Sequence, residues 1–480
     1  MLTSILILVH GVVVLLVGTR LVMSRRPVGA TLAWLYLVVL IPVMGAAAYL
    51  LIGENRVGQR RRRKLREKIG PYENWYAELS DAHRPEWGLK DAPAARLDRL
   101  AREMTGFPAL AGNDLELLKD GQVALQRLRA DIQAAKSTIF LEFYIWESHG
   151  LVLEIERNLE AASQRGVCCH ILVDGVGSSE FLLSLSAESL RRAGVQIVET
   201  MPIGIMRSIV ARLDHRNHRK IAVIDGLIAF TGSLNMADPV VLRKDEDVGD
   251  WVDCMVRLKG PVVDELALLF LSDWELETEE GCLDGALSQD LGRSKIAGHA
   301  NALVLPSGPA TSPDAIRDML LTTIYLARDE LVLTTPYFIP GEPLLAAIKA
   351  AARRGVCVKI IVPKQNDSLF VRLAAPAYFD ELLEAGVEVF IYGRGLLHSK
   401  TICVDREFSV VGSVNLDLRS FHLNFEVSLF AFDEAFSKDL RELQNQYLAA
   451  SEGLDLKSWM KRSWLRRLVE KIARLLSPLL

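Results

Sequence analysis

Two long apolar segments open the chain and predict membrane helices. Residues 2–23 carry no ionisable side chain apart from His10 and Arg20, and residues 30–52 carry no charged side chain. A helix of about twenty mainly apolar residues is long enough to span the hydrocarbon core of a bilayer. Because only residues 24–29 separate the segments, we expect a transmembrane hairpin whose two ends emerge on the same side.

A strongly basic run follows the hairpin and predicts its orientation. The consecutive basic residues Arg60–Lys64 place the following region in the cytoplasm by the positive-inside rule. Arg25 and Arg26 in the short loop oppose this orientation, but the downstream cluster is larger and decides. A cleaved signal peptide is the alternative for the first segment, although a signal carries its basic residues before the apolar stretch rather than after it.

From residue 97 onward the chain alternates between strand-like and helix-like segments, which indicates an α/β fold. Short β-rich runs occur at residues 139–145, 167–173 and 195–198, and the same order of runs returns at residues 330–335, 355–362 and 386–391. Short matching sequences, Arg-Gly-Val at 165–167 and 354–356, accompany the runs. An internal duplication with pseudo-symmetric halves explains this recurrence.

The pattern gives an expected organisation for the whole chain. It comprises a transmembrane helical hairpin over 1–55, a basic juxtamembrane linker over 56–96, α/β repeats over 97–285 and 286–450, and an amphipathic C-terminal helix over 451–480. In the last segment, apolar and basic residues alternate at helical spacing. Such a helix can lie on anionic membrane lipid or pack on the domain, and the sequence leaves both interpretations open.

Charge narrows the possible partners. The chain has a net charge of −4, so it lacks the positive field of a general nucleic-acid binder, and no nucleic-acid partner is expected. Half of the residues are hydrophobic. The sequence leaves open whether the protein works as a monomer or as a homo-oligomer.

Each repeat reaches the same group of polar residues, and the two groups are offset by 180 residues (398 − 218, 405 − 225 and 412 − 232). Each is a histidine, a lysine two residues later, an aspartate seven residues after the histidine, and then Gly-Ser-x-Asn. The members are His218, Lys220, Asp225, Ser233 and Asn235 in the first repeat, and His398, Lys400, Asp405, Ser413 and Asn415 in the second. Two such matches in register are not chance.

The residue types predict phosphodiester chemistry. In an extended strand residues i and i+2 face the same way, so each histidine is expected to project with its lysine. If the repeats pack about a pseudo-two-fold axis, two imidazoles and two ammonium groups converge. The lysines, serines and asparagines can hold phosphate oxygens, while one histidine attacks phosphorus and the other transfers protons. A metal site is the rival interpretation, but a lysine within each motif argues against it, and no metal is expected.

The paired motifs resemble the HKD motifs of the phospholipase D superfamily. The segments 31–53, 304–309 and 414–426 are in addition similar to bacterial cardiolipin synthases. With the C-terminal segment, the resemblance covers nearly the whole chain. It implies two pseudo-symmetric phospholipase D-type α/β repeats behind the hairpin, in a multi-pass protein of the bacterial cytoplasmic (inner) membrane.

The resemblance also implies a reaction and roles for the residues. One phosphatidylglycerol would donate its phosphatidyl group to a histidine and release glycerol, and a second would accept the group to give cardiolipin, without metal or other cofactor. By analogy His218 is the nucleophile and His398 the general acid and base, although pseudo-symmetry allows the reverse. Asp225 and Asp405 would be structural or orienting partners. Glu426 is a candidate supporting residue, with Asp250 or Asp253 as its counterpart in the first repeat.

Other functions remain open at this stage. A phospholipase D would use water in place of the alcohol, and the chemistry before acceptor attack is identical. A phosphatidylserine synthase-like transferase is a further possibility. A nuclease is disfavoured by the apolar segments and the acidic net charge. A catalytically silent membrane scaffold is disfavoured because both motifs are intact.

Overall fold

The computed structural model describes residues 2–23, 28–41, 43–49, 73–88, 92–201, 215–242, 249–278, 291–309 and 314–475. The chain forms two compact units, one made of residues 1–61 and 203–215 and the other of residues 62–202 and 216–480. The basic run Arg60–Lys64 and the loop with Arg25 and Arg26 lie outside the described residues.

The described part of the first unit is helical. It contains α1 (Leu2–Met23), α2 (Val28–Leu40) and α3 (Met44–Ala48), which pack on one another through a small cluster that includes Val17, Val38 and Tyr49. The second apolar segment is therefore not one continuous helix. Its first helix ends two residues before Pro42, as expected because proline disfavours a helical conformation in the residue before it. No helix in the described residues has the length and hydropathy required of a membrane span.

The second unit begins with α5 (Glu73–Ala82) and α6 (Ala92–Thr105) and continues into the first repeat. The elements of this repeat are β1 (Leu110–Leu118), α7 (Gly121–Ala134), β2 (Thr138–Phe143), α8 (Leu151–Gln164), β3 (Cys168–Asp174), α9 (Ser179–Leu182), α10 (Leu185–Arg192), β4 (Gln196–Thr200), β5 (Arg216–Asn217), β6 (Ile221–Ile224), β7 (Ile228–Gly232), β8 (Trp251–Val252), β9 (Met255–Lys259) and α12 (Val262–Thr278).

The second repeat follows the same plan. Its elements are β10 (Ala300–Ser307), α13 (Ala315–Leu326), β11 (Glu330–Thr334), β12 (Phe338–Ile339), α14 (Gly341–Arg353), β13 (Cys357–Pro363), α15 (Leu369–Ala374), α16 (Pro376–Glu384), β14 (Glu388–Tyr392), β15 (Leu396–Leu397), β16 (Thr401–Val404), β17 (Phe408–Gly412), β18 (Leu416–Asp417), α17 (Leu418–His422), β19 (Asn424–Phe432) and α18 (Glu434–Ala449). The chain then adds β20 (Ser451–Gly453), α19 (Leu456–Trp459) and α20 (Trp464–Leu475).

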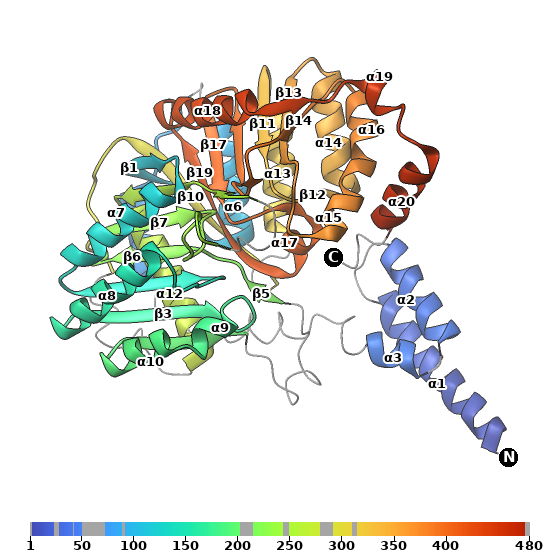
Figure 1. The fold of residues 1–480 in the computed structure, drawn as a ribbon, viewed down its shortest axis with the longest axis horizontal. Coiled ribbons are helices and arrows are strands. Elements are labelled where there is room, and N and C mark those ends of the chain that lie inside the picture. The colour runs from blue at the N-terminus through green and yellow to red at the C-terminus, as the bar shows by residue number, and fades with distance from the viewer. Residues whose placement is uncertain are drawn as a thin grey trace. The chain divides into compact units, whose positions relative to one another are not determined.

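One mixed sheet joins the two repeats, and its strand order demonstrates the duplication (Figure 1). From the centre outward, the first repeat runs β1-β9-β7-β6-β2-β3-β4 and the second runs β10-β19-β17-β16-β11-β13-β14. The two series correspond strand for strand, and β1 pairs antiparallel with β10 where they meet. The predicted α/β fold with two pseudo-symmetric repeats is thus confirmed, and the predicted strand runs fall on β2, β3, β4, β11, β13 and β14.

Helices cover both faces of this sheet because its central strands are apolar on both sides. In β2, Ile139 and Leu141 face one cluster with α7, α8 and α10, while Phe140 between them faces a second cluster with α12. In β11, Leu331 and Leu333 likewise oppose Val332. Almost every residue of α12 is buried, as expected for a helix that is apolar around most of its circumference.

Two short parallel pairings cross between the repeats. Strand β5 of the first repeat pairs with the start of β19 in the second, through Arg216 with Asn424 and Asn217 with Phe425. Strand β15 of the second repeat pairs in the same way with β8 of the first. Because each pairing ends directly before a histidine motif, each repeat fixes the motif of the other in place.

Candidate active site

The sequence predicted that each histidine lies inside an extended strand. In the structure each histidine instead begins a short segment between two strands. His218 donates its main-chain N–H to Phe425 O at 2.8 Å, and His398 donates its own to Val252 O at 2.8 Å. The lysine ammonium groups turn back, so that Lys220 Nζ donates to His218 O and Lys400 Nζ to His398 O. The motifs are therefore held by main-chain bonds to the opposite repeat.

The His398 imidazole pairs with a carboxylate from the other repeat. Its Nδ1 lies 2.8 Å from Asp253 Oδ1, and both side chains are buried. Burial lowers the pKa of His398 to about 4, although Asp253 opposes this effect. Burial would raise the pKa of Asp253, but His398 and Lys400 lower it to about 2. Asp253 is therefore a carboxylate placed to fix the imidazole orientation and to stabilise an imidazolium.

The His218 imidazole has a corresponding partner in the second repeat. Its Nδ1 lies 3.4 Å from Glu426 Oε1, and the Asn424 amide nitrogen lies 3.2 Å from both of these atoms. Burial would raise the pKa of Glu426, but His218 and Lys220 keep it below the usual value. Among the expected acidic residues, Glu426 and Asp253 thus contact the histidines, while Asp250 meets Leu396 through its main-chain oxygen.

The two pairs cross the repeat boundary in opposite directions. His218 of the first repeat meets Glu426 of the second, and His398 of the second meets Asp253 of the first. Asp253 precedes Cys254, whose main chain bonds to Ser233 of the same repeat. Glu426 likewise precedes Val427, whose main chain bonds to Ser413. Neither repeat alone supplies a complete histidine–carboxylate pair, so the site is a property of the duplicated molecule.

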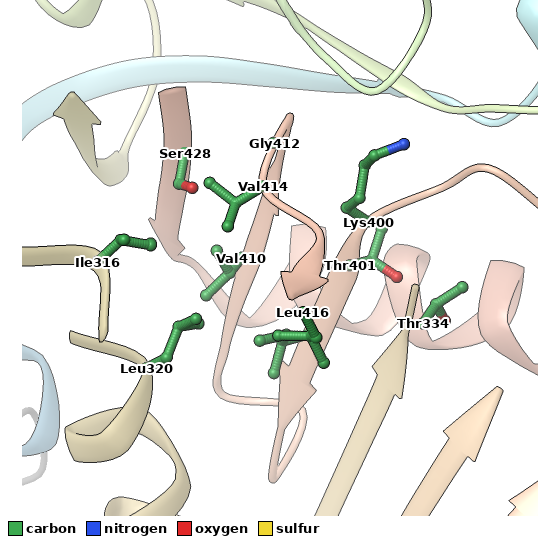
Figure 2. A pocket seen from close by; sticks show the side chains of 11 residues that line it. Ile316, Leu320, Thr334, Lys400, Thr401, Val410, Gly412, Val414, Leu416 and Ser428 are labelled. Atoms are coloured by element: carbon green, nitrogen blue, oxygen red, sulfur yellow. The ribbon is translucent and has the colours of Figure 1, made fainter. Parts of the chain in front are cut away.

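The two lysines are buried cations in electrostatic contact. Burial lowers the pKa of Lys220 to about 8, against the effect of Glu426 and Asp253. Burial, together with the charge of Lys220, lowers the pKa of Lys400 to about 7, against the effect of Asp253. An apolar cavity lies beside the aliphatic part of the Lys400 side chain. Figure 2 shows the Lys400 ammonium pointing away from the aliphatic side chains that line this cavity. Incoming negative charge would favour the ammonium form of both groups.

Aromatic rings contact both histidines, and these two aromatic residues were not predicted from the sequence. The Tyr144 ring lies 4.0 Å from the His218 ring and 5.7 Å from Lys220 Nζ. The Trp251 ring lies 4.5 Å from the His398 ring. A signal for both was available. Tyr144 lies near the end of the predicted strand run 139–145, and Trp251 precedes Asp253 by two residues, as Asn424 precedes Glu426.

The predicted phosphate-binding serines have main-chain partners. Ser233 Oγ exchanges hydrogen bonds with the Cys254 main chain, and Ser413 Oγ does so with the main chain of Val427. They brace the segments that carry the carboxylates. Asn235 Oδ1 accepts the Ile145 N–H at 3.3 Å. The Oδ1 atom of Asn415, its counterpart in the second repeat, is buried without a hydrogen-bond partner among the described atoms.

The two motif aspartates are not brought to the histidines. Asp225 accepts the main-chain N–H groups of residues 136–138, and Asp405 accepts those of residues 328–330. Both have a positive φ, 54° and 52°, a conformation that aspartate tolerates better than most residues. Asp225 thereby ties the turn after β6 to the start of β2, and Asp405 ties the turn after β16 to the start of β11. These hydrogen bonds join main-chain groups away from the two histidines.

A buried polar network supports the first motif from behind. Asn217 Nδ2 donates to Glu142 Oε1 at 2.6 Å, and its N–H donates to Asp174 Oδ2 at 3.0 Å. Arg219 forms an ion pair with Asp273, and its Nε donates to Glu426 O at 3.2 Å. Arg219, which lies between the histidine and the lysine of the first motif, therefore links this motif to the main chain of Glu426 in the second repeat.

Comparison with known families decides how this geometry is assigned. The sequence model of a family described as cardiolipin synthase, PLD-like domain, matches residues 128–274 and 320–448, one segment in each repeat. The chain belongs to this family of phospholipase D-like cardiolipin synthases. A second model, described as phospholipase D-nuclease N-terminal, matches residues 12–54.

Relatives agree over almost the whole length. Cardiolipin synthase A of Cronobacter sakazakii is 40% identical over 464 residues, which cover 97% of this chain and 96% of the relative. Cardiolipin synthase A of Yersinia pseudotuberculosis is 40% identical over 474 residues, 98% of each. Among solved structures, phosphatidylserine synthase of Haemophilus influenzae matches with a TM-score of 0.56 at 17% identity, over 80% of this chain and 97% of that one. That likeness shows a shared fold.

Proposed function

We propose that this enzyme makes cardiolipin from two phosphatidylglycerol molecules through a phosphohistidine intermediate. Cardiolipin synthase activity follows from family membership and from 40% identity across nearly the whole chain. The observation that carries the mechanism is the pair of imidazoles, each oriented by a carboxylate of the opposite repeat. Two histidines with separate partners can divide nucleophilic attack from proton transfer.

In the first half-reaction, His218 Nε2 attacks the phosphorus of one phosphatidylglycerol. The bond from phosphorus to the glycerol headgroup oxygen breaks, and protonated His398 gives its proton to that oxygen, so free glycerol leaves. His218 suits the nucleophilic role because its side chain is the more exposed of the two, 17% against 9%. His398 suits proton transfer because Asp253 stabilises its charged form.

In the second half-reaction, the terminal hydroxyl of another phosphatidylglycerol gives its proton to neutral His398 and attacks phosphorus. The phosphorus–nitrogen bond to His218 breaks, which yields cardiolipin and restores both histidines. Lys220 and Lys400 would stabilise the charge on the phosphate oxygens, supplying positive charge of the kind that a metal ion provides in other phosphoryl-transfer enzymes.

The electrostatics of the site support substrate-dependent activation. The pKa of His398 is about 4, so this imidazole is neutral near pH 7 before substrate binds. A bound phosphodiester brings a negative charge, which raises the pKa of His398 and of both lysines. Phosphatidylglycerol would thereby favour the protonated His398 that the first step requires.

We also propose that the N-terminal helices form a transmembrane hairpin of the bacterial inner membrane, with the catalytic domain in the cytoplasm. The supporting observations are the apolar segments 2–23 and 30–52 and the basic run Arg60–Lys64. The domain boundaries at residues 55, 96, 285 and 450 belong to the same proposal. Reporter fusions after residues 26 and 70 test the topology: the hairpin predicts an external first fusion and a cytoplasmic second one.

The reaction is tested with the purified full chain in phosphatidylglycerol vesicles that contain EDTA, with products identified by mass spectrometry. Cardiolipin and free glycerol in equal amounts, both absent from His218→Ala, are expected. Phosphatidic acid alone would identify a hydrolase. No turnover until a metal ion is added would overturn the mechanism. Acid-quenched protein that carries a phosphatidyl adduct on His398 in place of His218 would reverse the two roles.

A further inference from the structure

Helix α20 is attached to the catalytic unit by its polar side. It packs against α15 and α16 (Figure 1). Glu470 is buried and accepts hydrogen bonds from arginines 462 and 466. Arg467 pairs with Asp380, and Arg474 with Glu381 and Glu342. Ion pairs of Arg467 and Arg474, together with the buried Ala473, therefore hold α20 on the unit.

The apolar side of α20 faces away from the unit. Its large apolar residues are exposed, at Trp464 75%, Leu465 58%, Leu468 44%, Val469 43%, Ile472 49% and Leu475 77%. At 100° per residue these six positions fall within one arc of about 140°. A helix on a soluble domain turns its apolar stripe toward the core. Because α20 turns its apolar stripe outward, we expect this stripe to be buried against something other than the catalytic unit.

The charge around this face specifies what would cover it. Residues 457–475 contain seven lysines or arginines and one acidic residue, Glu470. Three of the lysines, Lys457, Lys461 and Lys471, are exposed in the described structure. An apolar stripe flanked by exposed lysines suits the interface of an anionic bilayer, where the stripe enters the acyl boundary and the lysines meet headgroups.

The position of α20 relates it to the active site. Lys400 directly precedes Thr401, which pairs with Thr334 at the carboxyl end of β11. Strand β13 runs parallel to β11, so its carboxyl end lies at the same edge of the sheet. Helix α15 follows β13 and contacts α20. Helix α20 therefore lies at the edge of the sheet where Lys400 is.

We propose that the exposed face of α20 docks into the surface of a phosphatidylglycerol-containing bilayer and so turns the active-site end of the catalytic unit toward lipid headgroups. This contact is separate from the N-terminal helices. It does not depend on the reaction proposed above, because it concerns where the helix lies and not what the histidines do.

Photo-crosslinking of the full chain in phosphatidylglycerol vesicles identifies what covers the face. Benzoylphenylalanine replaces Leu465 or Leu468 in separate variants, with Leu227, an exposed leucine in the turn after β6, as the matched control. Lipid adducts at 465 and 468 with few at 227 are expected. Adducts to a second copy, adducts to residues 2–49 of the same chain, or yields equal to the control would each overturn the proposal.

Kinetics provide a second readout. Leu468→Glu/Ile472→Glu should lower kcat/KM on vesicles by at least about tenfold, because burial of one aliphatic side chain corresponds to about a factor of ten or more in binding. Turnover of short-chain, monomerically dissolved phosphatidylglycerol should not change, which also shows that the variant folds. Val123→Glu/Leu227→Glu, at other exposed apolar positions, is the control. Equal losses in both variants, or none on vesicles, would contradict docking. A wild-type chain inactive on both substrates would instead refute the proposed function.

Discussion

Replacing Asp253 with asparagine tests the division of labour between the two histidines. The asparagine keeps the size of the side chain and removes the charge 2.8 Å from His398 Nδ1. Burial already lowers the pKa of His398 to about 4, and Asp253 opposes that shift. Without the carboxylate the pKa falls further, so less imidazolium is available to protonate glycerol, and less forms when the acceptor hydroxyl is deprotonated.

The size of the effect follows from the lost interaction. A hydrogen bond to a charged partner contributes about 1.5–3 kcal/mol. Since each 1.36 kcal/mol of barrier changes a rate about tenfold, Asp253→Asn should lower kcat about 10- to 100-fold. KM should change much less, because the carboxylate acts on the charge formed in the transition state rather than on substrate binding.

The assay is cardiolipin formation from phosphatidylglycerol in detergent micelles across about pH 6–9, together with the thermal unfolding midpoint. Asp225→Asn serves as the control, because Asp225 binds the main-chain N–H groups of residues 136–138 outside the site. If Asp253→Asn keeps kcat within about twofold of the wild type at an unchanged unfolding midpoint, His398 does not depend on this carboxylate and the assignment fails.

Three further predictions follow. Glu426→Gln should slow accumulation of the phosphatidyl-enzyme in rapid-quench experiments by about tenfold, because its charge stabilises His218 as it becomes positive. The value of kcat/KM should fall as pH rises through about 7 to 8, since Lys400 and Lys220 of the substrate-free enzyme then lose their protons. A flat pH profile of kcat/KM up to pH 9 contradicts this. Asp405→Ala should destabilise the fold by about 2–4 kcal/mol through three lost main-chain hydrogen bonds and strain at positive φ, visible as a lower thermal midpoint with little change in kcat of the folded fraction.

The sequence was sufficient to predict the repeats and to locate the two histidine motifs. Strand periodicity located β2, β3, β11 and β13, and the 180-residue offset identified both motifs. These features are local, or are comparisons of one local pattern with another. The reading of each motif as a continuous strand was wrong, because the segment between His218 and Lys220 leaves the β5 pairing before β6 begins.

What the sequence did not reveal is which carboxylate serves which histidine. Asp253 and Glu426 were both candidates, but each was expected to serve the motif of its own repeat. The pairing depends on β5 and β8 reaching across the boundary to β19 and β15, and strands of two residues leave no periodic signal. The outward orientation of α20 was also open, because amphipathicity gives the same pattern whichever side packs on the protein.

The crossed arrangement has a consequence for how the enzyme uses its substrate. His398, Lys220 and Lys400 are all buried, and burial lowers the pKa of each. Burial in the folded site therefore reduces the positive charge that these three groups carry. In the mechanism proposed above, a phosphodiester bound at this site would supply negative charge to all three groups, so that binding would favour their protonation. Because each histidine depends on a carboxylate from the other repeat, a shift of one repeat against the other would uncouple both pairs together.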